Sequence, residues 1–172
     1  MGRYHGLTEG TDGDIYTLQG MQVVQFTFKH GRYSIKEKIK LSIIEEFEKW
    51  LILSRLRNLL FSDGKLYITD SGLHKLLIVD MRTGHQTALG YMGEGIGQFK
   101  NPAGIISDNA GNLLLADQGN NRILVCNSFG NWIKIGAHME ENLEQPCGIN
   151  LHGDDVMVAC RGGVVRYQLN SK

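Results

Sequence analysis

Residues 104–117 read Gly-Ile-Ile-Ser-Asp-Asn-Ala-Gly-Asn-Leu-Leu-Leu-Ala-Asp, and this stretch decides the fold. A short apolar run is followed by Asp, Asn and Gly, which favour tight turns, and then by a second apolar run that ends in Asp117. Turn residues at 118–121 and 127–130 separate two more runs with the composition of strands. We therefore predict four short antiparallel strands joined by tight turns within about 45 residues.

This unit recurs along the chain. Residues 65–70 match 112–117 at a distance of 47 residues, and 156–160 match the same strand 43 residues further on. With an earlier copy that begins at His5, we count four copies. A four-stranded unit that recurs every 40–50 residues or so is typical of a β-propeller, in which each sheet, or blade, packs its faces against the neighbouring blades.

One copy also resembles a known repeat. Residues 93–105, Gly-Glu-Gly-Ile-Gly-Gln-Phe-Lys-Asn-Pro-Ala-Gly-Ile, followed by 116–123, Ala-Asp-Gln-Gly-Asn-Asn-Arg-Ile, resemble an NHL repeat, and the flanking copies resemble it more weakly. The resemblance implies the six-bladed propeller of TRIM-NHL proteins, which often binds RNA and mediates post-transcriptional repression. The RING and B-box zinc modules of that family are absent from these residues, so ubiquitin-ligase activity is not implied.

We expect an all-β fold, a partial or open ring of about four NHL-type blades with one inserted amphipathic helix. Ile43, Ile44, Phe47, Trp50 and Leu51 recur at helical spacing, which indicates either a helix packed on the propeller or a helix that binds a partner. An open ring exposes sheet edges, so self-association is also expected. The expected units are a partial blade at 1–35, the helical segment at 36–57, a blade at 58–90, the best-matching blade at 91–137 and an incomplete blade at 138–172.

Composition limits the class of protein. The 172 residues carry 18 Lys and Arg against 18 Asp and Glu, a formal net charge of zero. Cys126, Cys147 and Cys160 form no CxxC pair, which argues against a zinc finger and a disulfide framework. We find no signal peptide and no apolar stretch of the roughly 20 residues that would span a membrane. We therefore expect a cytoplasmic protein with no membrane partner.

The meander predicts which charges share a face. In each blade the start of the first strand and the turn between the second and third strands lie at the same end, here called the top. The sum over the top positions is about +4, and over the opposite turns about −5. Cations for phosphates, rings for stacking and amides for base edges favour single-stranded or stem-loop RNA. The predicted RNA-binding residues are Tyr4, Arg55, Arg57, His74, Lys75, Lys100, Asn101, Asn120 and Arg161.

Two other functions stay open at this point. The propeller could bind protein partners, as a scaffold or a substrate-recruiting module, without contacting nucleic acid. Some NHL-like propellers are zinc lyases, but a zinc site needs three convergent ligands, and only His5 and His74 fall at the top, with Asp70 as a third. We therefore predict that the protein is not an enzyme and that it has no cofactor and no metal site.

Overall fold

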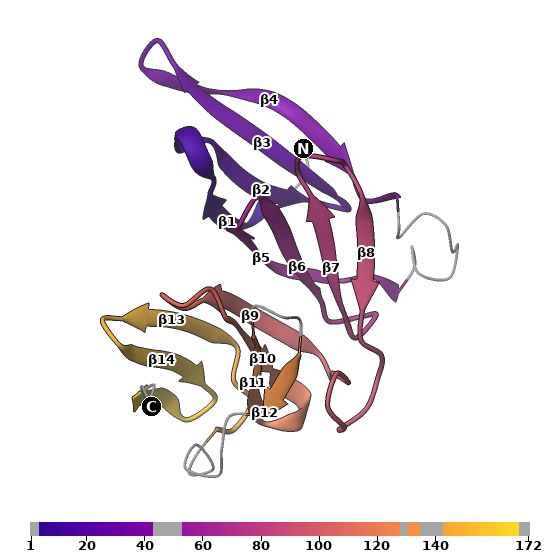
Figure 1. Ribbon diagram of the computed structural model, residues 1–172, viewed down its shortest axis with the longest axis vertical. Helices are drawn as coiled ribbons and strands as arrows, with labels where there is room; N and C mark the ends of the chain where they lie inside the picture. The colour runs from indigo at the N-terminus through magenta and orange to yellow at the C-terminus, as the bar shows by residue number, and fades with distance from the viewer. Residues whose placement is uncertain (1–3, 43–52, 128–130, 135–142, 169–172) are drawn as a thin grey trace.

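The computed structural model describes residues 4–42, 53–127, 131–134 and 143–168, and these residues form four separate antiparallel sheets (Figure 1). Each sheet is a meander in which consecutive strands pair. The first blade contains β1 (Tyr4–Glu9), β2 (Ile15–Gln19), β3 (Gln22–Lys29) and β4 (Arg32–Lys40), with a short 3-10 turn η1 (Thr11–Gly13) after β1. The prediction of an all-β propeller of about four blades is confirmed.

The second and third blades repeat this order. The second contains β5 (Leu56–Ser62), β6 (Lys65–Asp70), β7 (Lys75–Asp80) and β8 (Gln86–Leu89). The third contains β9 (Pro102–Ser107), β10 (Leu113–Asp117), β11 (Arg122–Cys126) and β12 (Trp132–Lys134), with the 3-10 turn η2 (Gln118–Asn120) between β10 and β11. The fourth blade has three strands among the described residues, β13 (Gly148–His152), β14 (Asp155–Cys160) and β15 (Gly163–Gln168).

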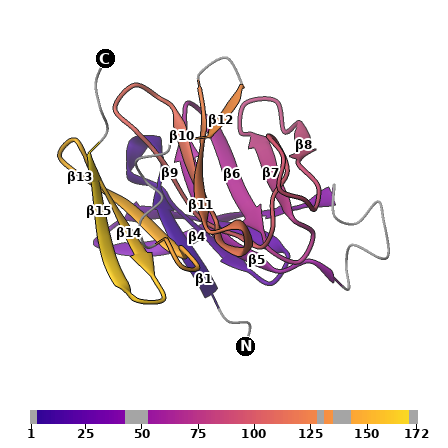
Figure 2. The ribbon, with the colours of Figure 1, turned by 90° about the horizontal axis from the view of Figure 1, so that it is seen from below.

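The blades stand in an open arc. The first strands of the blades, β1, β5, β9 and β13, contact one another in that order, and no comparable contact joins β1 to β13 among the described residues. The first blade therefore lies at one end of the molecule and the fourth at the other (Figure 1). Figure 2 shows the fourth blade beside the third from below.

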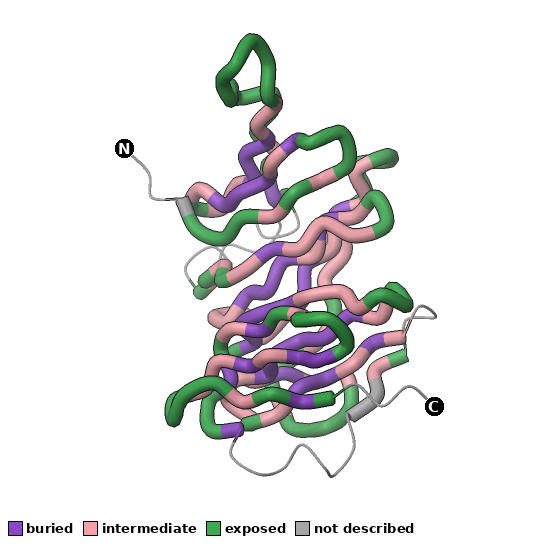
Figure 3. The backbone as a smooth tube through the Cα atoms, turned by 90° about the vertical axis from the view of Figure 1, so that its left-hand side faces the viewer, coloured by how far each residue is buried: buried purple, intermediate pink, exposed green. Residues whose placement is uncertain are grey.

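Apolar side chains fill the spaces between the sheets. One cluster joins the first and second blades through residues such as Leu18 and Leu66, and another joins the second and third through Leu76 and Phe99. A third cluster joins the third and fourth blades. Figure 3 shows the buried residues stacked between the sheets, with the exposed tip of the β3–β4 hairpin at one end. Burial of these faces is the main source of stability, because one blade alone cannot cover its apolar side chains.

The predicted inserted helix is not found in the part of the chain that the structure describes. Residues 36–40 are the end of β4, and residues 56–57 are the start of β5. The residues at helical spacing, 43–51, lie outside the described residues. Charged side chains dominate β4, which is an exposed edge strand, so it lacks the apolar pattern that marks a strand in a sequence. No helix among the described residues is long and apolar enough to cross a membrane.

Candidate functional site at the top of the blades

Two buried carboxylates organise the top of the second and third blades. Asp70 ends β6 and Asp117 ends β10, and both are 0% exposed. Oδ1 of Asp70 accepts the backbone N–H of Arg55 at 2.8 Å, and Oδ1 of Asp117 accepts the N–H of Lys100 at 2.6 Å. Each carboxylate therefore fixes the residue that leads into the first strand of its own blade.

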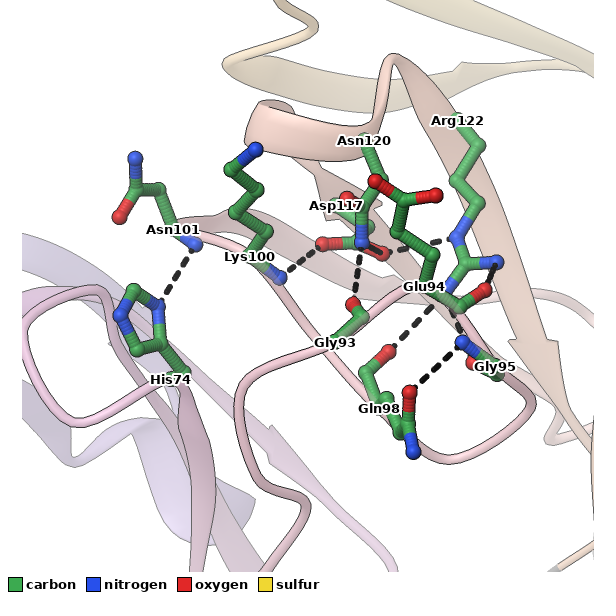
Figure 4. A network of polar contacts seen from close by, with 10 residues as sticks. All are labelled: His74, Gly93, Glu94, Gly95, Gln98, Lys100, Asn101, Asp117, Asn120 and Arg122. Atoms are coloured by element: carbon green, nitrogen blue, oxygen red, sulfur yellow. Dashed lines mark hydrogen bonds and ion pairs between the residues drawn. The ribbon is translucent and has the colours of Figure 1, made fainter.

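Asp117 also holds Arg122, which supports a loop (Figure 4). Nε of Arg122 donates to Asp117 at 2.8 Å, and its Nη2 donates to the carbonyls of Gly95 and Gln98 at 2.9 and 3.0 Å. Nδ2 of Asn120 donates to the carbonyl of Gly93 at 2.7 Å. The planar guanidinium thus satisfies several carbonyls of one loop at once, a geometry that only an arginine fork provides.

We call residues 90–98 the top loop. Asn120 and Arg122 hold its backbone by hydrogen bonds, and three of its large apolar side chains are exposed. Tyr91, Met92 and Ile96 are 62%, 63% and 72% exposed. The loop continues through Phe99 and Lys100 into β9, so it lies at the same end of the arc as the buried carboxylates Asp70 and Asp117. Exposed apolar groups on a rigid support are typical of surfaces that bind other proteins.

Neighbouring blades are linked at the top by a repeated hydrogen bond. Nδ1 of His74 accepts the N–H of Asn101 at 3.0 Å, which joins the second blade to the third (Figure 4). Oδ1 of Asn121 accepts the N–H of Gln145 at 2.9 Å, which joins the third blade to the fourth. All four residues have positive φ, between 50° and 56°, so the same strained turn geometry recurs at both junctions.

A pocket of about 310 Å³ lies where the first strands of the blades meet. It is lined by His5, Arg55, Leu56, Arg57, Asn58, Ala103, Gly104 and Cys147, which come from all four blades. The register of β1, β5 and β9 shifts near the top of each strand, between His5 and Leu7, between Leu56 and Asn58, and opposite residues 115–117. The pocket is therefore built at β-bulges, which redirect side chains and are frequent beside binding sites.

Gly104 keeps the pocket narrow. A Cβ atom at this position would lie 2.9 Å from the carbonyl oxygen of Cys147 and 2.9 Å from Cγ2 of Ile149. Only glycine lets β9 approach β13 this closely. The exposed Cys147 also lines the pocket. The half-buried Cys160, which ends β14, does not line it, and the pKa of its thiol is raised by burial and further by Cys147.

The two arginines give the pocket its charge. Arg55 and Arg57 are both exposed, and among the described residues no carboxylate forms an ion pair with either side chain. The carboxylate of Asp70 is occupied by other donors. It accepts hydrogen bonds from the Ser54 hydroxyl and from the backbone N–H groups of Arg55, Gly72 and Leu73. An anionic group can therefore enter between two guanidinium groups that no described acid neutralises.

Most of the other predicted RNA-binding residues have structural roles. Nζ of Lys75 donates to the carbonyl of Gly90 at 2.8 Å, and Arg161 pairs with Glu144 at 3.1 Å. His74, Asn101 and Asn120 take part in the contacts described above. Lys100 is held at its backbone by Asp117. Tyr4 begins β1, but its side chain lies outside the described part of the structure.

In the structure Arg55 and Arg57 line one pocket together with His5, Asn58 and Cys147, which were not among the predicted RNA-binding residues. The bulges determine which side chains line the pocket. In the sequence, the bulges of β1 and β9 are marked by a glycine, Gly6 and Gly104 respectively. Within the described residues, no group of three or more His, Cys, Asp or Glu side chains could hold a metal ion. His5 lines the pocket, whereas His74 links two blades.

Comparisons with known proteins support the propeller fold. No family model and no curated protein matches the chain. A streptogramin B lyase structure has a TM-score of 0.62 and 17% identity, over 96% of this chain and 54% of the lyase. A protein of unknown function from Bacteroides thetaiotaomicron has a TM-score of 0.71 and 13% identity, over 97% of this chain and 47% of its own. A chain of the nidogen/laminin complex has a TM-score of 0.58 and 16% identity, over 98% of this chain and 76% of its own.

These similarities show the fold alone, because all the identities are low. The chain spans about half the length of the lyase, at 54%. The comparisons support a β-propeller, and the TRIM-NHL type is not shown. The prediction that the protein is not an enzyme is wrong as it was argued, since similar propellers include the streptogramin B lyase and a virginiamycin B lyase from Staphylococcus aureus. The fold therefore gives no ground for excluding catalysis.

Proposed function

We propose that the protein is a β-propeller binding module that recognises an acidic segment of a protein partner at the top of the arc. The observation that carries the proposal is the bulge-lined pocket with Arg55 and Arg57, two exposed guanidinium groups without a described carboxylate partner. Guanidinium groups bind carboxylates through two parallel hydrogen bonds, which gives both charge and geometric selectivity.

The backbone around Arg55 and Arg57 is preorganised for binding. Asp70 holds the backbone of Arg55, and the residues on both sides of Arg57, Leu56 and Asn58, pair with β6, so little backbone freedom is lost on binding. The top loop adds Tyr91, Met92 and Ile96, side-chain types that are common in protein interfaces. One similar structure is a chain of a protein complex, that of nidogen and laminin, which is consistent with a protein ligand.

RNA recognition remains the alternative. Four of the nine predicted residues, His74, Lys75, Asn120 and Arg161, use their side chains for contacts within the protein. Lys100 and Asn101 are held at the backbone, so Arg55, Arg57 and Lys100 are the cations of an RNA surface. Three phosphate contacts would give a slope of about −2 for log affinity against log salt on single strands. A role in post-transcriptional regulation would rest on that binding.

The two ligand classes can be separated by fluorescence anisotropy. The probes are a labelled peptide rich in Glu with one Leu, the same peptide with Lys in place of Glu, and a 12-nucleotide oligouridine. We expect the acidic peptide to bind, and Arg57→Ala and Arg55→Ala each to weaken it about tenfold, or about 1.4 kcal/mol. Lys38→Ala is the matched control, because Lys38 is an exposed cation on β4 away from the pocket.

Three results would contradict the proposal. The first is no binding of the acidic peptide, and the second is binding that both arginine variants leave unchanged. The third is oligouridine binding that depends on the same arginines while the acidic peptide fails to bind, which would establish RNA as the ligand.

A further inference from the structure

The first two blades meet through a pair of stacked rings. Tyr16 of β2 and Phe61 of β5 lie with ring centroids 5.4 Å apart and ring planes 4° from parallel. Tyr16 is buried and belongs to the apolar cluster between the blades, and Phe61 packs against that cluster. A parallel, offset ring contact of this kind buries apolar surface between the two sheets.

The same position can be identified at the next interface. In β6, Tyr67 follows Gly64 as Tyr16 follows Gly13, so the two tyrosines occupy the same place in their blades. Ser107 pairs with Leu113 in the third blade just as Phe61 pairs with Leu66 in the second. Ser107 therefore holds, in the third blade, the position that Phe61 holds in the second, and it carries a hydroxymethyl group instead of a ring.

The third interface does not share this deficit. Leu114 takes the place of the tyrosine and Leu151 takes the place of Phe61, and both contribute to the apolar cluster between the third and fourth blades. Of the three interfaces in the described residues, the one between the second and third blades is the one in which these two equivalent positions hold a tyrosine and a small polar residue.

A cleft of about 720 Å³ lies between the second and third blades. Its apolar walls are Tyr67, Leu76 and Ile78 on one side and Leu113, Cys126 and Trp132 on the other. This volume is within the usual range for small-molecule sites, roughly 300–1,000 Å³. Tyr67, the counterpart of Tyr16, therefore lines this cleft, and Ser107 is not among the lining residues.

The rim of the cleft carries a small excess of negative charge. Asp63, Asp80, Lys65 and His85 line it. Oδ1 of Asp80 accepts the N–H groups of Arg82 and Thr83, whereas the exposed Asp63 forms no ion pair among the described residues. A ligand with a positively charged end is therefore favoured over one with a negative end.

The ionisation of Tyr67 fits this environment. Its pKa is raised first by burial and then by electrostatic interaction with Asp63 and Cys126. The hydroxyl group therefore stays neutral, and Asp63 lines the same cleft. An aromatic ring of a ligand that packs against Tyr67 would be removed from water. A positively charged group attached to that ring would lie in the same cleft as the Asp63 carboxylate.

We propose that this cleft binds a planar aromatic small molecule with a positively charged end, whose ring takes the position against Tyr67 that Phe61 takes against Tyr16. This site is distinct from the arginine pocket of the proposed function, since the two share no lining residue. The chemical class is an arylalkylamine, with one ring or two fused rings and a short flexible arm whose ammonium group reaches Asp63.

The test uses the whole chain with tryptamine and indole-3-acetate, which share an indole ring and differ in the charge of the arm. Ligand-observed NMR and isothermal titration calorimetry should show tryptamine binding with a Kd of about 1 mM or tighter, and indole-3-acetate at least tenfold weaker. Ser107→Phe restores the missing ring and should abolish tryptamine binding while raising the melting temperature of the protein. Tyr67→Leu should weaken tryptamine at least tenfold.

Tyr91→Leu is the matched control, because Tyr91 is an exposed tyrosine of the top loop and does not line the cleft. It should leave tryptamine binding unchanged. The proposal is overturned if tryptamine does not bind, if a folded Ser107→Phe protein binds it as the parent does, or if both indoles bind equally. Circular dichroism establishes whether each variant is folded, and Ser107→Phe keeps the test decisive if Tyr67→Leu unfolds.

Discussion

Nδ1 of His74 accepts the backbone N–H of Asn101 at 3.0 Å, and this single bond joins the turn after β6 to the residue before β9. Because both residues have positive φ, the bond connects two turns that are themselves conformationally restricted. The next junction uses the carboxamide of Asn121 for the same purpose. The side chain at this place in the blade therefore acts as a latch between blades, and histidine and asparagine serve it equally.

His74→Ala removes the latch and should lower the free energy of unfolding by about 1 kcal/mol, the usual net value of one hydrogen bond. His74→Asn should restore it, since Asn both accepts a hydrogen bond and tolerates positive φ. Urea unfolding and hydrogen exchange at the Asn101 amide measure the two effects. Equal stability of the Ala and Asn variants would show that the bond contributes nothing.

Phe61→Ala removes half of the stacked pair with Tyr16 and should destabilise the protein by about 3 kcal/mol, the lower end of the range for core phenylalanines, because Phe61 is half-buried. Phe28→Ala provides the control. Phe28 is 55% exposed near the tip of the β3–β4 hairpin, where its ring makes a tilted contact with that of Tyr33, so its loss should change stability by no more than about 1 kcal/mol. A comparable cost for both rings in chemical unfolding would mean that the stack has no special role.

Arg122 and Arg161 offer a comparison between a buried and an exposed ion pair. Arg122 is 14% exposed and Asp117 is fully buried, whereas Arg161 and Glu144 are 66% and 59% exposed. Arg122→Ala leaves a buried carboxylate without its cation and should cost about 3–5 kcal/mol. Arg161→Ala should cost no more than about 1 kcal/mol. Unfolding of both variants in urea measures the difference.

Arg122→Lys tests the fork geometry separately from the charge. A lysine keeps the positive charge but cannot donate to Asp117 and several carbonyls in one plane. The top loop should then lose protection from hydrogen exchange and become a site of limited proteolysis between Gly90 and Gln98. A lysine variant with a loop as protected as in the parent protein would show that charge alone holds the loop.

The ionisation of Asp14 should make the free energy of unfolding depend on pH in the acidic range. The Lys36 ammonium, at 2.7 Å, holds the pKa of the Asp14 carboxyl below its ordinary value, with a hydrogen bond from Gln25 adding to the effect. A lowered folded-state pKa contributes stability that is fully present above the unfolded value of about 3.9 and is lost as the pH falls through the folded value. Asp14→Asn should therefore be less stable than the parent at pH 7, and the difference should shrink towards pH 3.

Lys36→Met should reduce the same acid dependence, because it removes the main cause of the lowered pKa of Asp14. Urea unfolding of the three proteins at pH 7, 5 and 3 provides the measurement. If the free-energy difference between the parent and Asp14→Asn stays constant across this range, the carboxylate does not carry the effect.

The sequence predicted the blades because the turn residues and apolar runs are local features that recur. The Gly, Asp and Asn turns around residues 108–111 and the run 113–117 appear in the structure as expected. The prediction failed at β4, where Lys36, Lys38 and Lys40 lie on an exposed edge and the apolar side chains that mark a strand are few.

The candidate site was predicted only in part, for a different physical reason. Sequence patterns place a polar residue at the top of a blade, but they do not say whether a donor there meets solvent or a carbonyl of the same chain. Asn120 and Lys75 bind the top loop, whereas Arg55 and Arg57 face a pocket. The replacement of Phe61 by Ser107 also depends on strand register, which is known only once the strands are paired.

The order of contacts along the arc has a consequence for how the molecule comes apart. Each blade touches the blades next to it in sequence, so the free energy of the whole is close to a sum of unit terms and nearest-neighbour terms. The end blades have one such neighbour in the described structure, and they should open before the inner ones as denaturant is added. Unfolding would then begin at the end blades and proceed inward. The denaturant midpoint measured by a probe would depend on the blade in which the probe lies.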